Sequence, residues 1–405
     1  MQPLCLLIQD EVVMSNSQFD EIVERRGTNC AKWDTFDVLL GGEKDLIHVG
    51  CADMDFKAPE PILKEFHRLA DHGVFGYSDI FDDFYSAIER FYRHHHNVDI
   101  KHEHMVFCPR INIGCGLVAE AFTRPYEEVL IHSPSYGPLR QAIEENGRKL
   151  VEVPLRYDGV EYSLNIEDLE QAVTKRTRML ILVNPHNPTT RVFTKAELEQ
   201  IAQFCLDHDL ILFADEIHSD LLAKDVTFTS VLELDEKYQK NIILASSPAK
   251  TFNIPGLVGS FMIISNDKLR ARVADEISRI GEHNPNVFFN AALIAAYTKC
   301  DDYIANLRCY LDDNEAYLRK EFATLFPKSH IIKRDGSYLL WIDLSKCFTS
   351  EEQIRDFFVT KARVGIYFGS QFSKDCSLFI RFNMAAPRKV LEEVLSRLNK
   401  VKQSS

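Results

Sequence analysis

The chain has 405 residues, of which 45% are hydrophobic and 26% are charged. This is the composition of an ordinary globular protein with room for two or three domains, and it excludes a disordered or collagen-like chain. Asp and Glu number 60 against 47 Lys and Arg, so the formal net charge is −13 at pH 7. A chain this acidic repels a phosphate backbone, which argues against general nucleic-acid binding.

The N-terminal region holds a short apolar run, Pro3 to Ile8, with neither a basic segment before it nor a small-residue cleavage site after it. We therefore expect no secretory signal. The chain has no stretch of 18 apolar residues, so we expect no transmembrane helix and no contact with a membrane. None of the ten cysteines forms a C-x-x-C pair, which favours reduced thiols and a cytoplasmic location over a zinc site or a disulfide framework.

The run from His94 to His96 is the feature that most suggests a metal. Consecutive residues point in different directions on a helix or a strand. We therefore expect a solvated helix end at this run, and no metal site.

Five short apolar runs in the middle of the chain indicate strands buried on both faces, because they are rich in Ile, Leu and Val and do not alternate with polar residues. They are Val129–Ile131, Met179–Val183, Leu210–Ala214, Ile242–Ala245 and Phe261–Ile264. Helical patterns lie between them. The clearest runs from Lys195 to His208 and begins with a capping box of Thr194 and Glu197. This alternation predicts an α/β fold with a mostly parallel sheet and helices on both faces.

The last third of the chain has a different order of elements. It predicts a smaller α+β domain, with a helix over Cys300–Leu325, a strand over Tyr338–Leu344, a helix over Ser350–Ala362, a strand over Ser377–Phe382 and a helix over Arg388–Lys402. We divide the chain into an N-terminal extension with part of the small domain (residues 1–60), a large cofactor-binding domain (61–295) and a C-terminal small domain (296–405).

Polar side chains follow three of the predicted strands at the point where each strand ends. They lie in the segments Asn184–Pro188, Asp215–His218 and Ser246–Lys250. Because the carboxyl ends of parallel strands meet at one edge of a sheet, we expect an amide, a carboxylate, an imidazole and an amine to converge there. Each also has a structural explanation, since Asn-Pro forms turns, an Asp ending a strand caps helices and a lone Lys is usually exposed.

A lysine, an aspartate and an amide in one site suit pyridoxal 5′-phosphate (PLP). The amine forms a Schiff base with the aldehyde of the cofactor, and the carboxylate keeps the pyridine nitrogen protonated, which preserves the electron sink. Two unit charges about 4 Å apart attract by roughly 4 kcal/mol at an effective dielectric of ~20, before desolvation. The sequence therefore predicts a PLP site.

The motifs of the chain resemble those of fold-type I, class I/II aminotransferase-like enzymes. More narrowly, the chain is similar to the cystathionine β-lyase (C–S lyase) branch, which includes the bacterial maltose-regulon modulator. The motifs that carry the resemblance are KWD (32–34), ADMDF (52–56), HGVFGY (72–77), NPHNPTTRVF (184–193), DEIHSDL (215–221), SPAKTFNIPGL (247–257), NPNVF (284–288) and RFNMAAPR (381–388). The resemblance implies the PLP-dependent transferase fold type I, with a mostly parallel sheet of the seven-stranded type, helices on both faces and a smaller α+β domain.

The resemblance also implies which residues bind the cofactor. Lys250 forms the covalent link and shuttles the proton, Asp215 pairs with the pyridine nitrogen, and Asn187 and His218 face the phenolic oxygen. Further cofactor contacts come from the Tyr136 ring, which stacks on the pyridine, and from the phosphate contacts at a helix N-terminus, which are the Ser247 hydroxyl and the backbone amides of Ile111 and Asn112. For Tyr136, a core aromatic residue is the alternative.

Three further expectations concern the substrate and a partner subunit. The resemblance implies that Arg381 binds the substrate α-carboxylate through its planar guanidinium, with Asn187 beside it. A surface position on a strand is the alternative for Arg381. The resemblance also implies that Tyr77 reaches the phosphate from the neighbouring subunit and joins Lys250 in catalysis, so that the protein is a homodimer.

The chain departs from the family pattern at several positions, which bear on substrate preference more than on cofactor binding. Arg110, Thr190 and Ala249 replace a usual Gly, Gly and Ser. Residues 367–370 read YFGS where Asn-Pro-Gly-Ser is expected, and residues 49–51 read VGC where an aromatic residue is familiar.

The function implied by the resemblance is β-elimination from cystathionine or another S-substituted L-cysteine. The products are pyruvate, ammonia and a thiol, as in methionine biosynthesis. A class I/II aminotransferase is the second hypothesis, since it shares the early steps. A regulatory or binding protein on the same scaffold is the third.

Overall fold

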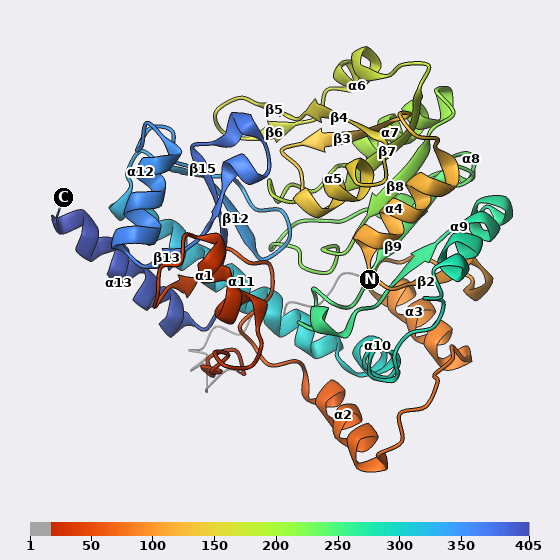
Figure 1. The fold of residues 1–405 in the computed structure, drawn as a ribbon, viewed down its shortest axis with the longest axis horizontal. Coiled ribbons are helices and arrows are strands. Elements are labelled where there is room, and N and C mark those ends of the chain that lie inside the picture. Colours follow the sequence, from red (N-terminus) through yellow and green to blue (C-terminus); the bar gives the residue numbers. More distant parts are fainter. Residues whose placement is uncertain (1–17, 405) are drawn as a thin grey trace.

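The computed structural model describes residues 18–404 (Figure 1), so the apolar run Pro3–Ile8 lies outside the described residues. Its centre is a seven-stranded sheet in the order β2-β10-β9-β8-β7-β3-β4. The strands are β2 (Met105–Cys108), β3 (Glu128–Ser133), β4 (Lys149–Pro154), β7 (Thr177–Val183), β8 (Ile211–Asp215), β9 (Ile242–Ser246) and β10 (Ser260–Ile263). Strands β4, β3, β7, β8 and β9 are parallel neighbours, and only β10 runs antiparallel to its neighbours β9 and β2. The prediction of a mostly parallel sheet is confirmed.

Side chains along each central strand alternate between two hydrophobic cores. In β7, Met179 and Ile181 face helices α4 (Ile111–Phe122), α5 (Gly137–Glu144) and α9 (Asp267–Arg279). Leu180 and Leu182 belong to the other core, to which helix α7 (Lys195–Asp207) contributes. Because apolar helices cover both faces, no strand position needs a polar residue, and this explains the continuous apolar runs in the sequence.

The remaining helices of the large sheet region contribute to the same core as α7. Helix α10 (Val287–Lys299) packs against both α2 (Glu60–His72) and α3 (Asp82–His95), and α6 (Ile166–Ala172) and α8 (Glu236–Gln239) lie against α7. Strands β5 (Arg156–Tyr157) and β6 (Tyr162–Ser163) form a separate hairpin. The predicted capping box at the start of α7 is present, with the Thr194 hydroxyl and the Glu197 carboxylate each accepting a backbone N–H.

The C-terminal part has the predicted mixture of helices and strands. Helix α11 (Asp301–Leu325) leads to an antiparallel sheet of β11 (His330–Ile331), β12 (Leu339–Asp343), β15 (Phe379–Asn383) and β14 (Tyr367–Phe368), with helices α12 (Glu351–Arg355) and α13 (Arg388–Ser404). Near the N-terminus, α1 (Phe36–Leu39) precedes β1 (Ile47–His48), which pairs with β13 (Val364–Gly365). The division of the chain at residues 60 and 295 stays a prediction. None of the helices within residues 18–404 is long and apolar enough to cross a membrane.

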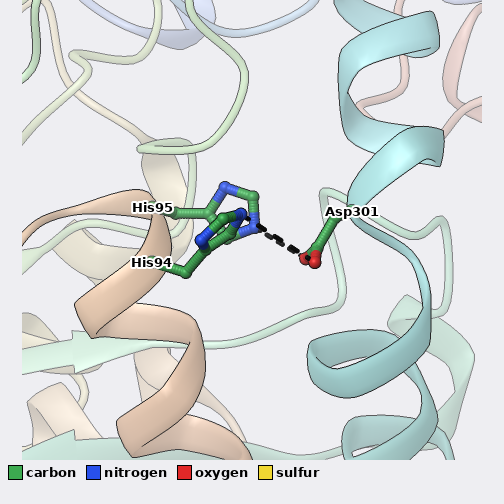
Figure 2. A group of neighbouring side chains, drawn as sticks. All are labelled: His94, His95 and Asp301. Carbon is green, nitrogen blue, oxygen red and sulfur yellow. Dashed lines mark hydrogen bonds and ion pairs between the residues drawn. The ribbon is translucent and has the colours of Figure 1, made fainter. Parts of the chain in front are cut away.

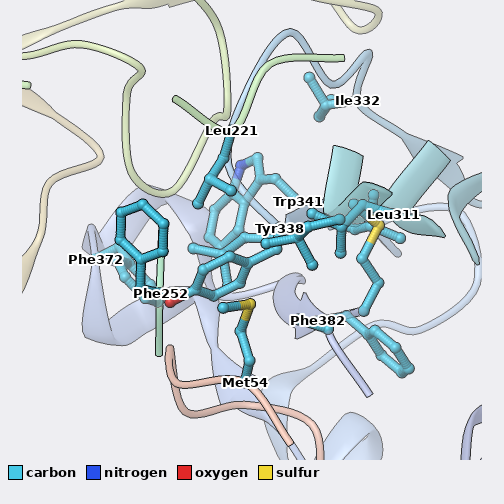
Figure 3. Close-up of a cluster of buried hydrophobic side chains, with 14 of the residues drawn as sticks. Met54, Leu221, Phe252, Leu311, Ile332, Tyr338, Trp341, Phe372 and Phe382 are labelled. Carbon is cyan, nitrogen blue, oxygen red and sulfur yellow. The ribbon is translucent and has the colours of Figure 1, made fainter. Parts of the chain in front are cut away.

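One buried cluster joins segments that are far apart in the sequence (Figure 3). Met54 comes from the ADMDF motif, Phe252 from the segment after Lys250, and Tyr338 and Trp341 from the region of β12. This core fixes the backbone of three segments whose neighbouring residues carry the polar groups described below.

The histidine run at the end of α3 forms the expected solvated helix end only in part: His94 is exposed, whereas most of the His95 and His96 side chains is covered. His94 and His95 both point toward Asp301 at the start of α11 (Figure 2), with their Nε2 atoms 3.9 and 2.9 Å from the carboxylate. The His96 side chain is only 6% exposed and faces a different carboxylate. The expectation is wrong for His95 and His96 because the last turn of α3 packs against other elements. Arg90 also binds Asp301, so this carboxylate already has a cationic partner.

Candidate active site

A pocket lies where β7, β8 and β9 end, beside the first turn of α4. Eight of the ten predicted site residues line it: Ile111, Asn112, Tyr136, Asn187, Asp215, His218, Ser247 and Lys250. Arg381 lies directly behind Asn187, whereas Tyr77 is elsewhere. The convergence expected from the parallel sheet is therefore present.

Lys250 and Asp215 place an amine and a carboxylate in the same pocket. The Lys250 amine donates a hydrogen bond of 2.6 Å to the carbonyl of Ala52. Burial lowers the pKa of Lys250, and the charge of Arg381 lowers it further. Burial raises the pKa of Asp215 to about 6, although the backbone N–H of Ile217 donates to its carboxylate. A cation beside this carboxylate would favour its charged form.

Arg381 is fixed behind the pocket by several contacts, so its alternative as a surface strand residue is wrong. It lies on β15 and is 2% exposed. Its two terminal nitrogens donate to Asn187 Oδ1 at 3.0 Å and to the Gly50 carbonyl at 2.9 Å. The rings of Tyr367 and Phe372 lie 4.7 and 4.9 Å from the guanidinium carbon. Its Nε is buried without a hydrogen-bond partner.

Asn187 and His218 have polar atoms available for a ligand in the pocket. Arg381 occupies the Asn187 oxygen, which leaves the amide N–H groups of Asn187 to donate to a ligand. Burial lowers the pKa of His218 well below its usual value, and the charges of Lys250 and Arg381 act in the same direction. His218 is therefore a neutral imidazole at pH 7, and its Nδ1 is buried without a partner.

The first turn of α4 forms the anion-binding end of the pocket. The first backbone N–H groups of a helix have no partner within the helix, and here those of Ile111 and Asn112 belong to pocket-lining residues. Arg110 precedes the helix with φ −153° and ψ 148°, an extended conformation that any residue adopts. Replacing the family's Gly by Arg therefore costs no backbone strain at this position, and it adds a cation to the pocket lining.

The Ser247 hydroxyl has partners within the protein. It donates to the Gly259 carbonyl at 2.7 Å and accepts from the backbone N–H of Ala249. The hydroxyl must break its hydrogen bond to the Gly259 carbonyl before it can donate to a phosphate. The backbone amides of α4 are therefore the stronger phosphate donors in this pocket.

The two predicted tyrosines lie in very different surroundings. Tyr136 precedes α5, lines the pocket and also packs against the hydrophobic core that includes α5. The prediction of a pocket residue and the alternative of a core aromatic residue each describe part of its surroundings. Burial raises the pKa of Tyr136 and keeps the phenol protonated. Tyr77 lies in the loop between α2 and α3, is fully exposed and does not line the pocket of its own chain.

The sequence did not reveal how the KWD and ADMDF motifs contribute to the site. They contact each other: the Lys32 amine is 2.7 Å from the Asp55 carboxylate, and the Trp33 indole N–H donates to the same group at 2.9 Å. Arg25 binds both Asp53 and Asp55. The outer face of the pocket wall is therefore held by the N-terminal segment.

Backbone carbonyls of the same wall are the functional groups that sequence reasoning missed. The Ala52 carbonyl accepts from Lys250 and from the Tyr338 hydroxyl, and the Gly50 carbonyl accepts from Arg381. A carbonyl group leaves no side-chain signal. Only the position of ADMDF among the family motifs could have pointed to this wall.

Residues 44–398 of the chain match the family model for aminotransferase class I and II. The chain belongs to this family. Among curated aminotransferase-family relatives, cystathionine β-lyase PatB of Bacillus subtilis is 31% identical over 94% of this chain and 98% of its own length. Protein MalY of Escherichia coli is 30% identical over 94% of this chain and 97% of its own. Cystalysin of Treponema denticola, whose crystal structure contains PLP, superposes with a TM-score of 0.92 at 27% identity, covering 95% of this chain and 98% of cystalysin.

The pocket of this class I/II aminotransferase-family chain fits PLP. Its amine and buried carboxylate match the aldehyde and the pyridine nitrogen, and the free N–H groups of α4 match the phosphate. The unpartnered His218 Nδ1 and the amide N–H groups of Asn187 provide polar atoms for the phenolic oxygen. The unpartnered Arg381 Nε leaves a donor for a carboxylate.

Proposed function

We propose that the protein is a PLP-dependent carbon–sulfur β-lyase that cleaves cystathionine or another S-substituted L-cysteine to pyruvate, ammonia and a thiol. The observation that carries the proposal is that Lys250 and Asp215 line one pocket and that the guanidinium of Arg381 lies directly behind it, hydrogen-bonded to the pocket residue Asn187. The likeness to a cystathionine β-lyase over nearly the whole chain supports the choice of reaction.

When it is bound, PLP supplies an electron sink beside the Cα of the substrate. The residues of the chain provide the rest. Lys250 holds the cofactor and then takes the Cα proton, a role that its lowered pKa favours because more of the amine is neutral. Asp215 keeps a positive charge on the pyridine nitrogen. Arg381 holds the substrate carboxylate, and this orients the Cα–H bond toward Lys250.

The decisive test follows pyruvate and free thiol together in purified, PLP-loaded protein given L-cystathionine and no 2-oxo acid. We expect both products in equal amounts. Lys250→Ala should abolish turnover, and Lys389→Ala, at an exposed lysine on α13, serves as the matched control. Unchanged pyruvate production by Lys250→Ala would exclude the proposed role of this lysine.

Transamination is the second candidate, favoured by the family to which the chain belongs. It uses the same lysine, aspartate and arginine up to removal of the Cα proton. Turnover that requires an added 2-oxo acid and yields no thiol would replace the lyase proposal by this one.

We also propose that the protein is a cytoplasmic homodimer in which Tyr77 completes the phosphate site of the partner. The loop that carries Tyr77 exposes Val74, Phe75 and Phe81 as well, and exposed apolar clusters of this kind mark interaction sites. Eight cysteines form no disulfide, which suits the cytoplasm: Cys30, Cys51, Cys108, Cys115, Cys205, Cys300, Cys347 and Cys376. Release of homocysteine from cystathionine would serve methionine biosynthesis.

Complementation tests the shared site. Lys250→Ala and Tyr77→Ala chains are each inactive as homodimers if Tyr77 acts across the interface. A mixed dimer then contains one site with both native residues, so mixing the unfolded chains and refolding them together should restore activity. No recovery in a mixture that forms mixed dimers would contradict the proposal.

A further inference from the structure

A buried carboxylate links the segment that bears Lys250 to the end of helix α3. The Thr251 hydroxyl donates to Asp220 Oδ2 at 2.6 Å, and His96 Nε2 is 3.0 Å from Asp220 Oδ1. Thr251 is fully buried, and the side chains of His96 and Asp220 are only 6% and 7% exposed. Both carboxylate oxygens are therefore committed to partners from other parts of the chain.

These three residues join the two loops that form the pocket. Asp220 lies on the loop after β8, which also bears Asp215 and His218. Thr251 follows Lys250 in the segment after β9. The carboxylate of Asp220 thus bridges the loop with the acid and the imidazole to the segment with the amine. None of the three residues lines the pocket itself.

The charges of the pair make its hydrogen bonds strong. Burial alone would lower the pKa of His96, but the hydrogen bond and the charge of Asp220 raise it, and Glu216 and Glu233 act in the same direction. Burial alone would raise the pKa of Asp220, but His96 and Thr251 hold it below its usual value. Both shifts favour the ionic form of the pair, and charge-assisted hydrogen bonds are stronger than neutral ones.

The imidazole of His96 lies among aromatic rings, which carry no charge that could replace it. The rings of Phe91, Tyr92 and Phe228 contact the imidazole. Removing one member of a buried ion pair leaves the other charge uncompensated. Losing His96 should therefore disturb Asp220, and through it Thr251.

We propose that His96, Asp220 and Thr251 are positioning residues, which fix the Lys250 segment relative to the loop bearing Asp215 and His218. This inference rests on the proposed role of Lys250. Displacement of a reacting group by about 1 Å can cost on the order of 10²-fold in rate. The hydrogen bond between Thr251 and Asp220 can therefore affect turnover although neither residue contacts the substrate.

The central test compares Thr251→Val, which removes the hydroxyl at nearly constant volume, with Thr251→Ser, which keeps it. We expect Thr251→Val to lower kcat at least about 10-fold with little change in KM, and to raise the dissociation constant of PLP from the apoprotein. Thr251→Ser should stay within about threefold of the parent in both quantities.

Thr177→Val is the matched control for general destabilisation. Thr177 is also buried and also donates its hydroxyl to a buried carboxylate, Glu128, but it lies at the start of β7, the opposite end from the pocket. If Thr251→Val lowers the melting temperature like Thr177→Val while kcat and the PLP dissociation constant stay at the parent values, the three residues are merely structural and the inference is wrong.

His96→Gln provides a second test if Thr251→Val does not fold. Gln keeps an N–H donor but removes the charge. We therefore expect kcat to fall by less than in Thr251→Val, and PLP to bind more weakly than in the parent. Parent values in both would overturn the inference. Lys250→Ala separates the two proposals: if that variant keeps turnover, the role of Lys250 is wrong, whatever the Thr251 and His96 variants do.

Discussion

The glutamate that follows Asp215 in DEIHSDL offers a sharp test of the electrostatics around the pocket. Glu216 is 1% exposed, and its carboxylate accepts the Ser230 hydroxyl at 2.7 Å and the Val231 backbone N–H at 2.8 Å. Burial raises its pKa to about 7, from a usual value of 4.5. The two donors and the charge of His96 lower the pKa, but they do not offset the desolvation.

The sign of the effect on stability follows from proton binding. Between about pH 4.5 and pH 7 the folded chain holds the Glu216 proton, whereas the unfolded chain has released it. The folded state therefore binds more protons in this window, so this group makes the protein less stable as the pH rises through it. A shift of about 2.5 units corresponds to about 3 kcal/mol, since one unit is worth about 1.4 kcal/mol.

The variant Glu216→Gln removes this titration and keeps the size and polarity of the side chain. We expect the difference in free energy of unfolding, variant minus parent, to be about 3 kcal/mol larger at pH 8 than at pH 4, so that the variant is relatively more stable at high pH. Urea unfolding at both pH values, with PLP at one saturating concentration, measures the difference. The control is Glu236→Gln, at an exposed glutamate on α8. A Glu216→Gln effect that is the same at both pH values would refute the reasoning.

Three further variants test other parts of the structure. Arg381→Lys should raise KM for cystathionine at least about 10-fold in steady-state assays, because an ammonium cannot make the planar pair of hydrogen bonds; an unchanged KM would contradict the carboxylate site. Thr194→Ala should lower the free energy of unfolding by about 1 kcal/mol in urea titrations, since it removes the capping box of α7. Thr190→Gly should raise that free energy by about 1 kcal/mol, because Thr190 has φ 63° and a buried hydroxyl without a partner; a loss of stability would show that the strain is small.

The sequence predicted the central strands well because burial on both faces leaves a simple signal. The strand expected over Met179–Val183 is β7, only two residues longer, and the helix expected from Lys195 is α7. The sequence did not indicate that β10 would run antiparallel. Its apolar run looks like those of its parallel neighbours, and strand direction depends on how the chain returns after Lys250.

The candidate site was predictable where chemistry resides in side chains at the ends of strands. Lys250, Asp215 and Asn187 converge for this reason. The contacts of the histidine run were not predictable, because they depend on the packing of α3 against α11 and the β8 loop. The use of the Ser247 hydroxyl by Gly259 was also hidden, since it requires the position of a backbone carbonyl twelve residues away.

The pocket wall at Gly50 limits how this enzyme can be redesigned. A Cβ atom at Gly50 would lie 2.7 Å from the carbonyl carbon of Ile366 and 2.8 Å from the nitrogen of Tyr367, so any side chain there displaces β14. The Tyr367 ring on β14 lies on Arg381, and the Gly50 carbonyl binds the same guanidinium. Placing an aromatic residue at position 50 therefore requires simultaneous changes on β14. Positions 50 and 367 must therefore be varied together. In a mutant library that varies only one of them, most variants will lose the position of Arg381 that binds the substrate carboxylate.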